Sequence, residues 1–339
     1  MVSRRKYLRY AVGGIAGGLA GCLGSVGGSK SPKVKKYSLT TDFLFGGKYA
    51  GIFIAQKEGY YLDNGISLDV RAGHGSASTA KEVGAGSTDF GIADIAQFGL
   101  IQSKGTDVSA VMTHYATYPI FLIFRKSLGI SKPKDLEGHS LVNHPALAQW
   151  NAIPAFCKRN NVDYNKIDVI QVSPANLISY WVDGKADLGA FYAGSDGTVA
   201  EVTADKNGID YDTMFLSNYG FNIYSNVFGT RQSIIKENPE HVAGFVKATQ
   251  QGFEYAKQHP GEAVDYTLSV HPDLDKSMTR KQLDQLLQNQ FSSPETKNHA
   301  FGYMDKSKMG DTVSFINDYY PVDKKIAAKD LYTDKYVTS

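Results

Sequence analysis

The chain has 339 residues, of which 42% are hydrophobic and 21% are charged. This length predicts two lobes rather than one small core, and the composition is that of a globular protein. The formal net charge of +2 depends on a basic N-terminus, because residues 22–339 carry 32 basic and 34 acidic side chains, which excludes the basic surface of a nucleic-acid-binding protein.

The first 22 residues have the pattern of an export signal. A twin arginine, Arg4-Arg5, precedes a weakly apolar, glycine-rich run that ends in Leu-Ala-Gly-Cys at Cys22. The twin arginine resembles a twin-arginine export signal and the final box resembles a lipoprotein cleavage site, whereas the run is far shorter than the ~20 residues of a membrane span. We therefore expect a lipoprotein signal at 1–22, lipidation of Cys22, and a flexible tether at 23–36. Cys157 then has no disulfide partner, and the eight histidines contain no pair spaced for zinc.

From residue 37 onward, apolar strands alternate with helical patterns. This alternation predicts an α/β fold with mostly parallel sheets flanked by helices. The chain after residue 231 is predicted to be helical, and no internal repeat is evident. Predicted strands lie at 36–43, 66–70, 89–94, 108–115, 119–126, 139–144, 167–172, 186–193 and 224–231, and the main predicted helices at 48–61, 95–105, 145–160, 174–185 and 239–260.

One glycine loop is close to a cofactor-binding motif. Gly73-His74-Gly75-Ser76-Ala77-Ser78 lies between a predicted strand and helix, and Asp94 ends the next strand 21 residues after Gly73. An exported Rossmann-type NAD(P) oxidoreductase is therefore one interpretation. Two facts argue against it: Ser78 stands where that fingerprint needs Gly or Ala for tight packing, and the unit is the second strand–helix pair rather than the first.

Four segments in chain order resemble the solute-binding proteins of ABC transporters, in the branch that binds nitrate, sulfonates and the thiamine pyrimidine precursor. They are residues 46–70, 83–97, 129–141 and 238–264. The resemblance implies a type II periplasmic binding protein fold, with crossovers near 121–125 and 226–231. Lobe 1 would comprise 37–122 plus 230–335, and lobe 2 would comprise 123–229.

The ends of the strands predict the ligand-binding residues. Ligands of open α/β sheets lie beyond the carboxyl ends of the strands. Asp42 and Asp94 could instead cap helices, and His144 could form a helix entrance. The acids favour a solute with N–H or O–H donors, such as an aminopyrimidine, and a sulfonate, nitrate or other small anion is the alternative. The predicted residues are Asp42, Tyr49, Gly75, Ser76, Asp94, Tyr115, Tyr118, His144, Tyr192 and Asp196.

The same resemblance includes one enzyme, a fungal pyrimidine synthase with a lysine-bound pyridoxal phosphate. Its lysine and histidine positions are Ala93 and Gln97 here, and the chain has neither a G-x-S-x-G elbow nor a P-loop. We therefore expect a monomeric binding protein without cofactor or metal. It would be held at the outer face of the cell membrane by its lipid anchor and would deliver a small molecule to the permease and ATPase subunits of an ABC importer.

Overall fold

The computed structural model describes residues 34–337. The predicted signal and Cys22 lie outside the described residues, as does most of the tether. Lys35 and Lys36, which were assigned to the tether, instead begin the first strand, where they pair with Ile66 and Ser67. No helix within 34–337 is both long enough and apolar enough to cross a membrane.

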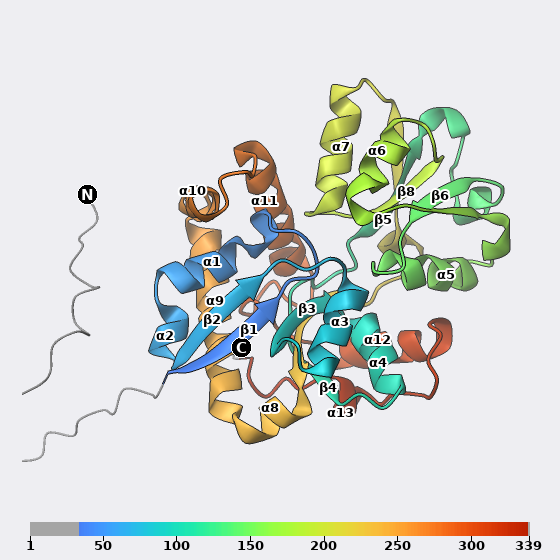
Figure 1. Cartoon of the computed structure of the whole chain (residues 1–339). Helices are drawn as coiled ribbons and strands as arrows, with labels where there is room; N and C mark the ends of the chain where they lie inside the picture. The colour runs from blue at the N-terminus through green and yellow to red at the C-terminus, as the bar shows by residue number, and fades with distance from the viewer. Residues whose placement is uncertain (1–33, 338–339) are drawn as a thin grey trace, which may run out of the picture. The chain divides into compact units, whose positions relative to one another are not determined.

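The chain forms two five-stranded sheets (Figure 1). The first sheet has the order β2-β1-β3-β10-β4 and the second has the order β7-β6-β8-β5-β9. In the first sheet the strands are β1 (Lys35–Thr40), β2 (Ile66–Arg71), β3 (Phe90–Asp94), β4 (Val108–Thr113) and β10 (Asn226–Arg231). In the second they are β5 (Ile120–Arg125), β6 (Ser140–Asn143), β7 (Asp168–Gln171), β8 (Leu188–Tyr192) and β9 (Tyr211–Phe215).

Helices flank both sheets, which confirms the predicted α/β class. The long helix α9 packs on α1, whereas α3 packs on α4 and on β3. The helices grouped with the first sheet are α1 (Ala50–Lys57), α2 (Tyr60–Asp63), α3 (Ser76–Ala85), α4 (Ile95–Ser103), α8 (Gln232–Glu237), α9 (Pro239–Gln258), α10 (Pro260–Val270), α11 (Lys276–Ser292), α12 (Lys306–Tyr319) and α13 (Ala328–Leu331). Those grouped with the second are α5 (Gln149–Arg159), α6 (Leu177–Val182) and α7 (Asp196–Lys206). Single 3-10 turns lie at Gly47–Tyr49, Lys126–Leu128, Pro133–Leu136, Tyr164–Lys166, Pro174–Asn176 and Leu216–Tyr219.

Both boundaries between the lobes lie at other residues than the sequence predicted. All of β5 pairs within the second sheet, and all of β10 pairs within the first. The crossovers are therefore residues 114–119 and 220–225, which precede these two strands instead of lying within them. Sequence pattern shows that a strand is buried, but not which sheet it joins, and this is why the boundaries were misplaced.

Two elements of the second lobe, α7 and β9, were absent from the sequence prediction. The buried face of α7 consists of small residues such as Gly197, Ala200 and Ala204, so its apolar periodicity is weak. The predicted helix at 145 begins instead at Gln149, because residues 144–147 form a turn closed by a hydrogen bond from the Leu147 amide to the His144 carbonyl.

The two lobes repeat one design, contrary to the prediction that the chain has no repeat. In each sheet, four strands run parallel and the strand that follows a crossover, β10 or β5, runs antiparallel. The sequences that enter β3 and β8 also match, since both read Gly-x-x-Asp-x-Gly, at 86–91 and 184–189. Gly86 and Gly184 both adopt left-handed backbone angles, at φ 79° and 74°.

The same side-chain contacts brace each repeat. Asp89 accepts hydrogen bonds from the amide and hydroxyl of Ser38, and Asp187 accepts the same pair from Ser140. At the end of the antiparallel strand, Arg231 donates to the carbonyls of residues 83 and 88, as Arg125 does to those of residues 181 and 182. The serine–aspartate contacts join residues 47–51 apart along the chain, and the arginine contacts join residues 56–148 apart, so local sequence patterns do not reveal them.

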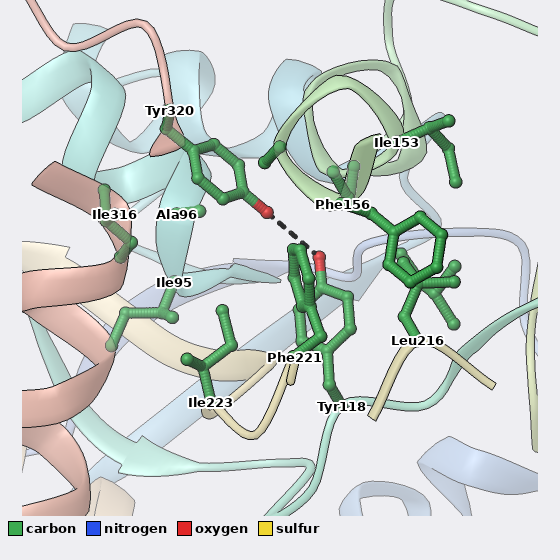
Figure 2. Packing of buried hydrophobic residues seen from close by; sticks show 14 of the residues in the cluster. Ile95, Ala96, Tyr118, Ile153, Phe156, Leu216, Phe221, Ile223, Ile316 and Tyr320 are labelled. Carbon is green, nitrogen blue, oxygen red and sulfur yellow. Dashed lines mark hydrogen bonds between the residues drawn. The ribbon is translucent and has the colours of Figure 1, made fainter. Parts of the chain in front are cut away.

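One hydrophobic cluster joins the two lobes at the crossovers. Figure 2 shows Phe221 and Ile223 of the second crossover and Tyr118 of the first, packed between residues of both lobes. Ile95 and Ile316 come from the first lobe, whereas Ile153, Phe156 and Leu216 come from the second. This packing makes the crossover region an apolar hinge core rather than a ligand surface.

Candidate functional site

A cavity lies at the carboxyl ends of strands from both sheets. Its walls come from segments that follow β1, β2, β6 and β8. The space open to the centre of a water molecule is ≈ 20 Å³, about enough for one water. Sites for organic ligands typically measure about 300–1,000 Å³, so an organic solute requires the lobes to separate. The lining residues are Asp42, Phe43, Gly75, Ser76, Leu147, Ala148, Gln149, Tyr192, Ser195 and Asp196.

A buried ion pair supports the first-lobe wall. The Lys48 ammonium lies 2.7 Å from one carboxylate oxygen of Asp42, and the Tyr49 hydroxyl donates to the other at 2.6 Å. Burial raises the pKa of Asp42, but Lys48, with smaller contributions from His114 and Tyr49, outweighs burial and holds this pKa below its usual range. Asp42 is therefore ionised and neutralised by Lys48, so the pair presents no net charge to the cavity.

Tyr192 connects the second lobe to the first. It ends β8, and its hydroxyl lies 3.0 Å from a carboxylate oxygen of Asp94 and 3.1 Å from the amide oxygen of Asn226, which share its single proton. Its ring also lies 5.8 Å from the Lys48 ammonium. Since Asp94 and Asn226 pair across β3 and β10, the hydroxyl is inserted between two adjacent strands of the first sheet.

Asp94 itself is fully buried and does not line the cavity. One carboxylate oxygen caps α4 by accepting the Ala96 amide at 2.9 Å. Of the two roles considered for Asp94, the structure therefore shows the helix cap. Burial raises the pKa of Asp94 to about 6, and hydrogen bonds from the Ala96 amide and from hydroxyl groups oppose this rise only in part. No cation is among the main causes of this pKa, and Asp94 forms no ion pair with residues 34–337, in contrast to Asp42.

The second-lobe wall presents two hydrogen-bond acceptors to the cavity. Asp196 uses one carboxylate oxygen to accept the amides of Tyr192 and Gly197, and Gln149 uses its side-chain NH₂ to donate to the Ala190 carbonyl. No side chain of residues 34–337 donates to the second carboxylate oxygen of Asp196 or to the amide oxygen of Gln149, and neither atom is fully enclosed by protein. Both residues are at least nine-tenths buried. Burial raises the pKa of Asp196 to about 6, although Lys48 and backbone amides partly offset it.

The glycine loop at Gly75 forms the contact between the lobes. The Ala77 amide, in the first turn of α3, donates to the Ala146 carbonyl of the second lobe at 3.1 Å. A Cβ at Gly75 would lie 2.2 Å from that carbonyl oxygen, and Gly75 has φ +132°, so only glycine fits. The buried Ser76 hydroxyl lines the cavity without a hydrogen-bond partner among the described residues.

The other predicted residues lie at different depths. Tyr49 and Tyr115 are behind the wall, where the Tyr115 hydroxyl donates to the Ala193 carbonyl at 3.1 Å. Tyr118 lies in the hinge core, hydrogen-bonded to Tyr320 at 3.2 Å (Figure 2). His144 accepts the Ala146 amide within the turn that precedes α5, so it neither lines the cavity nor caps the helix.

Six residues at or beside the site are not among the ten predicted ligand-binding residues, although three of them, Phe43, Lys48 and Ser195, lie in the strand-end loops from which those ten were chosen. If the start of α5 had been placed correctly, Gln149 would have been predicted as a ligand-binding residue. The sequence does not indicate that Lys48 is buried, because a lysine near the start of a helix is usually exposed. The residues are Phe43, Lys48, Leu147, Ala148, Gln149 and Ser195.

The positions of the fungal lysine and histidine do not provide a cofactor site. Ala93 is fully buried within β3, opposite Val227, and carries a methyl group where an amine would be needed. Lys48 cannot take the place of that lysine, because its ammonium is paired with the Asp42 carboxylate. These residues do not fit a lysine-bound pyridoxal phosphate. Among residues 34–337, no group of three or more His, Cys, Asp or Glu side chains is placed to hold a metal ion.

The family described as NMT1/THI5 like matches residues 47–263, which is more than half of the chain. The chain belongs to the NMT1/THI5-like family. Among similar proteins, the riboflavin-binding protein RibY from Chloroflexus aurantiacus is 21% identical over 90% of this chain and 87% of that protein. The formylaminopyrimidine-binding protein from Halalkalibacterium halodurans is 19% identical over 83% of this chain and 84% of that protein.

Other similar proteins include a synthase and an alkanesulfonate-binding protein. The 4-amino-5-hydroxymethyl-2-methylpyrimidine phosphate synthase from Legionella pneumophila is 23% identical over 68% of this chain and 72% of that protein. The alkanesulfonate-binding protein SsuA from Xanthomonas axonopodis pv. citri has a TM-score of 0.68 at 10% identity and covers 89% of this chain and 99% of its own. The structural similarity to SsuA confirms the prediction that this chain has a periplasmic binding protein fold.

We expect Asp94 to make the free energy of unfolding depend on pH. Its pKa is about 6 in the folded protein and near the usual 3.8 when unfolded, so the folded state binds more protons between these values. This contribution to stability is complete below the unfolded pKa and is lost as the pH rises through the folded pKa. In urea unfolding, the free energy of unfolding of wild type should fall by roughly 1–2 kcal/mol between pH 5 and pH 8, relative to that of Asp94→Asn over the same range. The same difference at both pH values would contradict the raised pKa.

Proposed function

We propose that this protein is an extracytoplasmic solute-binding lipoprotein that captures a small heterocyclic molecule between its lobes and delivers it to an ABC importer. The observation that carries the proposal is the pair of acceptors without side-chain donors in the inter-lobe cavity, on Asp196 and Gln149. Once a solute fills the cavity and displaces water, these acceptors need N–H or O–H donors from it, since an unmatched buried polar group costs about 1–3 kcal/mol. A heterocycle with amino or ring N–H groups supplies them.

The aromatic rings of the cavity suit the same class of solute. Tyr192 and Phe43 both line the space, and a flat ring can stack on or meet their faces. The riboflavin-binding and formylaminopyrimidine-binding relatives are named for heterocyclic ligands, which supports a ligand of this kind.

The charges at the cavity disfavour a small anion. Lys48 is the cation of the first-lobe wall, and Asp42 neutralises it at 2.7 Å. Asp196 carries a carboxylate with no ion-pair partner among residues 34–337. A sulfonate or nitrate would therefore meet repulsion from Asp196 without a free cation to offset it.

Capture would operate by population shift. Separated lobes admit the solute, and contacts to both walls favour the closed form, which a permease would recognise. The signal sequence at 1–22 supports export and anchoring through Cys22. The Legionella relative is named as a synthase, but Ala93 and Gln97 leave this chain without the fungal catalytic pair, and we propose binding rather than catalysis.

A thermal-shift panel tests the proposal. The panel contains formylaminopyrimidine, 4-amino-5-hydroxymethyl-2-methylpyrimidine, riboflavin, an alkanesulfonate and nitrate. We expect one or more of the heterocycles to stabilise the protein by about 2.7 kcal/mol at a hundredfold excess over Kd, which raises the melting temperature by several degrees. Stabilisation by the alkanesulfonate or nitrate, with none by the heterocycles, would overturn the assignment.

A second prediction concerns the acceptor on Asp196. Asp196→Asn keeps the shape and the oxygen that accepts the Tyr192 and Gly197 amides, but replaces the other oxygen by a donor. We expect the Kd of the stabilising heterocycle, measured by calorimetry, to rise about 10- to 100-fold, as for a lost hydrogen bond to a charged group. Asp205→Asn, exposed on the same helix, is the matched control and should bind as wild type. Unchanged affinity in Asp196→Asn would remove Asp196 from the site.

A further inference from the structure

Helix α11 presents three amide side chains along one face. Gln282, Gln285 and Asn289 are spaced by three and four residues, so they lie on the same side of the helix. Their partners belong to three separate parts of the protein. Each of the three segments is close to the cavity or to the hinge.

Gln282 ties the two walls of the cavity to each other. Its amide oxygen accepts the Gly47 amide of the first lobe at 2.9 Å, and its NH₂ donates to the Ser195 carbonyl of the second lobe at 3.2 Å. Gly47 directly precedes Lys48, and Ser195 directly precedes Asp196. A Cβ at Gly47 would lie 1.8 Å from the Thr279 carbonyl oxygen of α11, so this close approach needs glycine.

Gln285 and Asn289 extend the contact. The Gln285 amide oxygen accepts the Gly194 amide at 2.9 Å and also the Thr198 hydroxyl, both in the second lobe. Asn289 accepts the Thr117 amide at 3.1 Å and donates to the Thr117 carbonyl at 3.1 Å, within the first crossover. One helix therefore holds the hinge and the 194–198 segment together.

The apolar side of α11 secures the helix independently of these amides. Leu283 packs in a cluster with Ala50, Ile54 and Val264, all of the first lobe. Leu286 lies in the core of the first sheet. The glutamines are therefore not required to hold α11 in place, and their hydrogen bonds to the second lobe can break when the lobes separate.

We propose that Gln282 and Gln285 are positioning residues that latch the second lobe closed, and that they thereby set how long a captured solute stays bound. The latch acts through the 194–198 segment, which carries Ser195 and Asp196 of the cavity wall. The part of this inference that concerns solute residence rests on the proposed function. The part that concerns lobe closure does not.

Small-angle X-ray scattering of the protein without solute tests lobe closure. Each net hydrogen bond shifts the ratio of closed to open forms by roughly fivefold, so the three bonds from these glutamines to the second lobe shift it by about a hundredfold. We expect the double variant Gln282→Ala/Gln285→Ala to have a larger radius of gyration than wild type, with unchanged circular dichroism. Gln288→Ala, exposed on the same helix, should scatter as wild type. Identical scattering of the double variant and wild type would overturn the proposal.

Stopped-flow kinetics with the heterocycle that stabilises the protein most in the panel tests residence time. We expect the double variant to release it at least about tenfold faster and to bind it no more slowly than wild type, because its lobes are separated more often when the solute arrives. A slower association with unchanged release would contradict the latch. A larger radius of gyration in the variant, together with no stabilising heterocycle, would support the latch and count against the proposed function.

Discussion

The hydroxyl of Tyr192 is the contact on which the arrangement of the two lobes depends. It leaves the end of β8 and enters the first sheet between Asp94 and Asn226, while its own amide binds Asp196. One residue thus bridges the two sheets, orients an acceptor of the cavity, and places its ring beside Lys48. The cost is the burial of Asp94 without a cation, and the raised pKa of that carboxyl is the measure of this cost.

The two walls of the cavity differ in their charge. The first lobe neutralises Asp42 with Lys48 and packs Tyr49 against both, so its wall is polar but uncharged. The second lobe leaves Asp196 and Gln149 with acceptors that no described side chain satisfies. The lobes are repeats in topology and in their Ser–Asp and arginine braces, so this difference arises in the loops and not in the sheets. A shared scaffold with dissimilar loops accounts for one fold carrying different ligands within a family.

Local sequence predicted the elements well, but not their partners. Alternation of apolar residues located β1, β3 and β8, and the rule for strand ends brought Asp42, Tyr192 and Asp196 to one cavity. The same reasoning placed the crossovers inside β5 and β10, because pairing is decided by residues distant in sequence. It also missed Lys48, Gln149 and Gln282, whose roles come from contacts across lobes or from a helix start displaced by four residues. Tyr118 satisfied the pattern for a ligand residue, yet its surroundings make it part of the hinge core.

The central claim is that one solute contacts both lobes at once. Hydrogen–deuterium exchange with and without the stabilising heterocycle tests it most directly, since each wall is followed separately. The account predicts slower exchange in the first-lobe segments 42–49 and 74–79 together with the second-lobe segments 147–151 and 193–198. Protection confined to one lobe, or centred on the surface hollow lined by Phe45, Phe53 and His271, would contradict it.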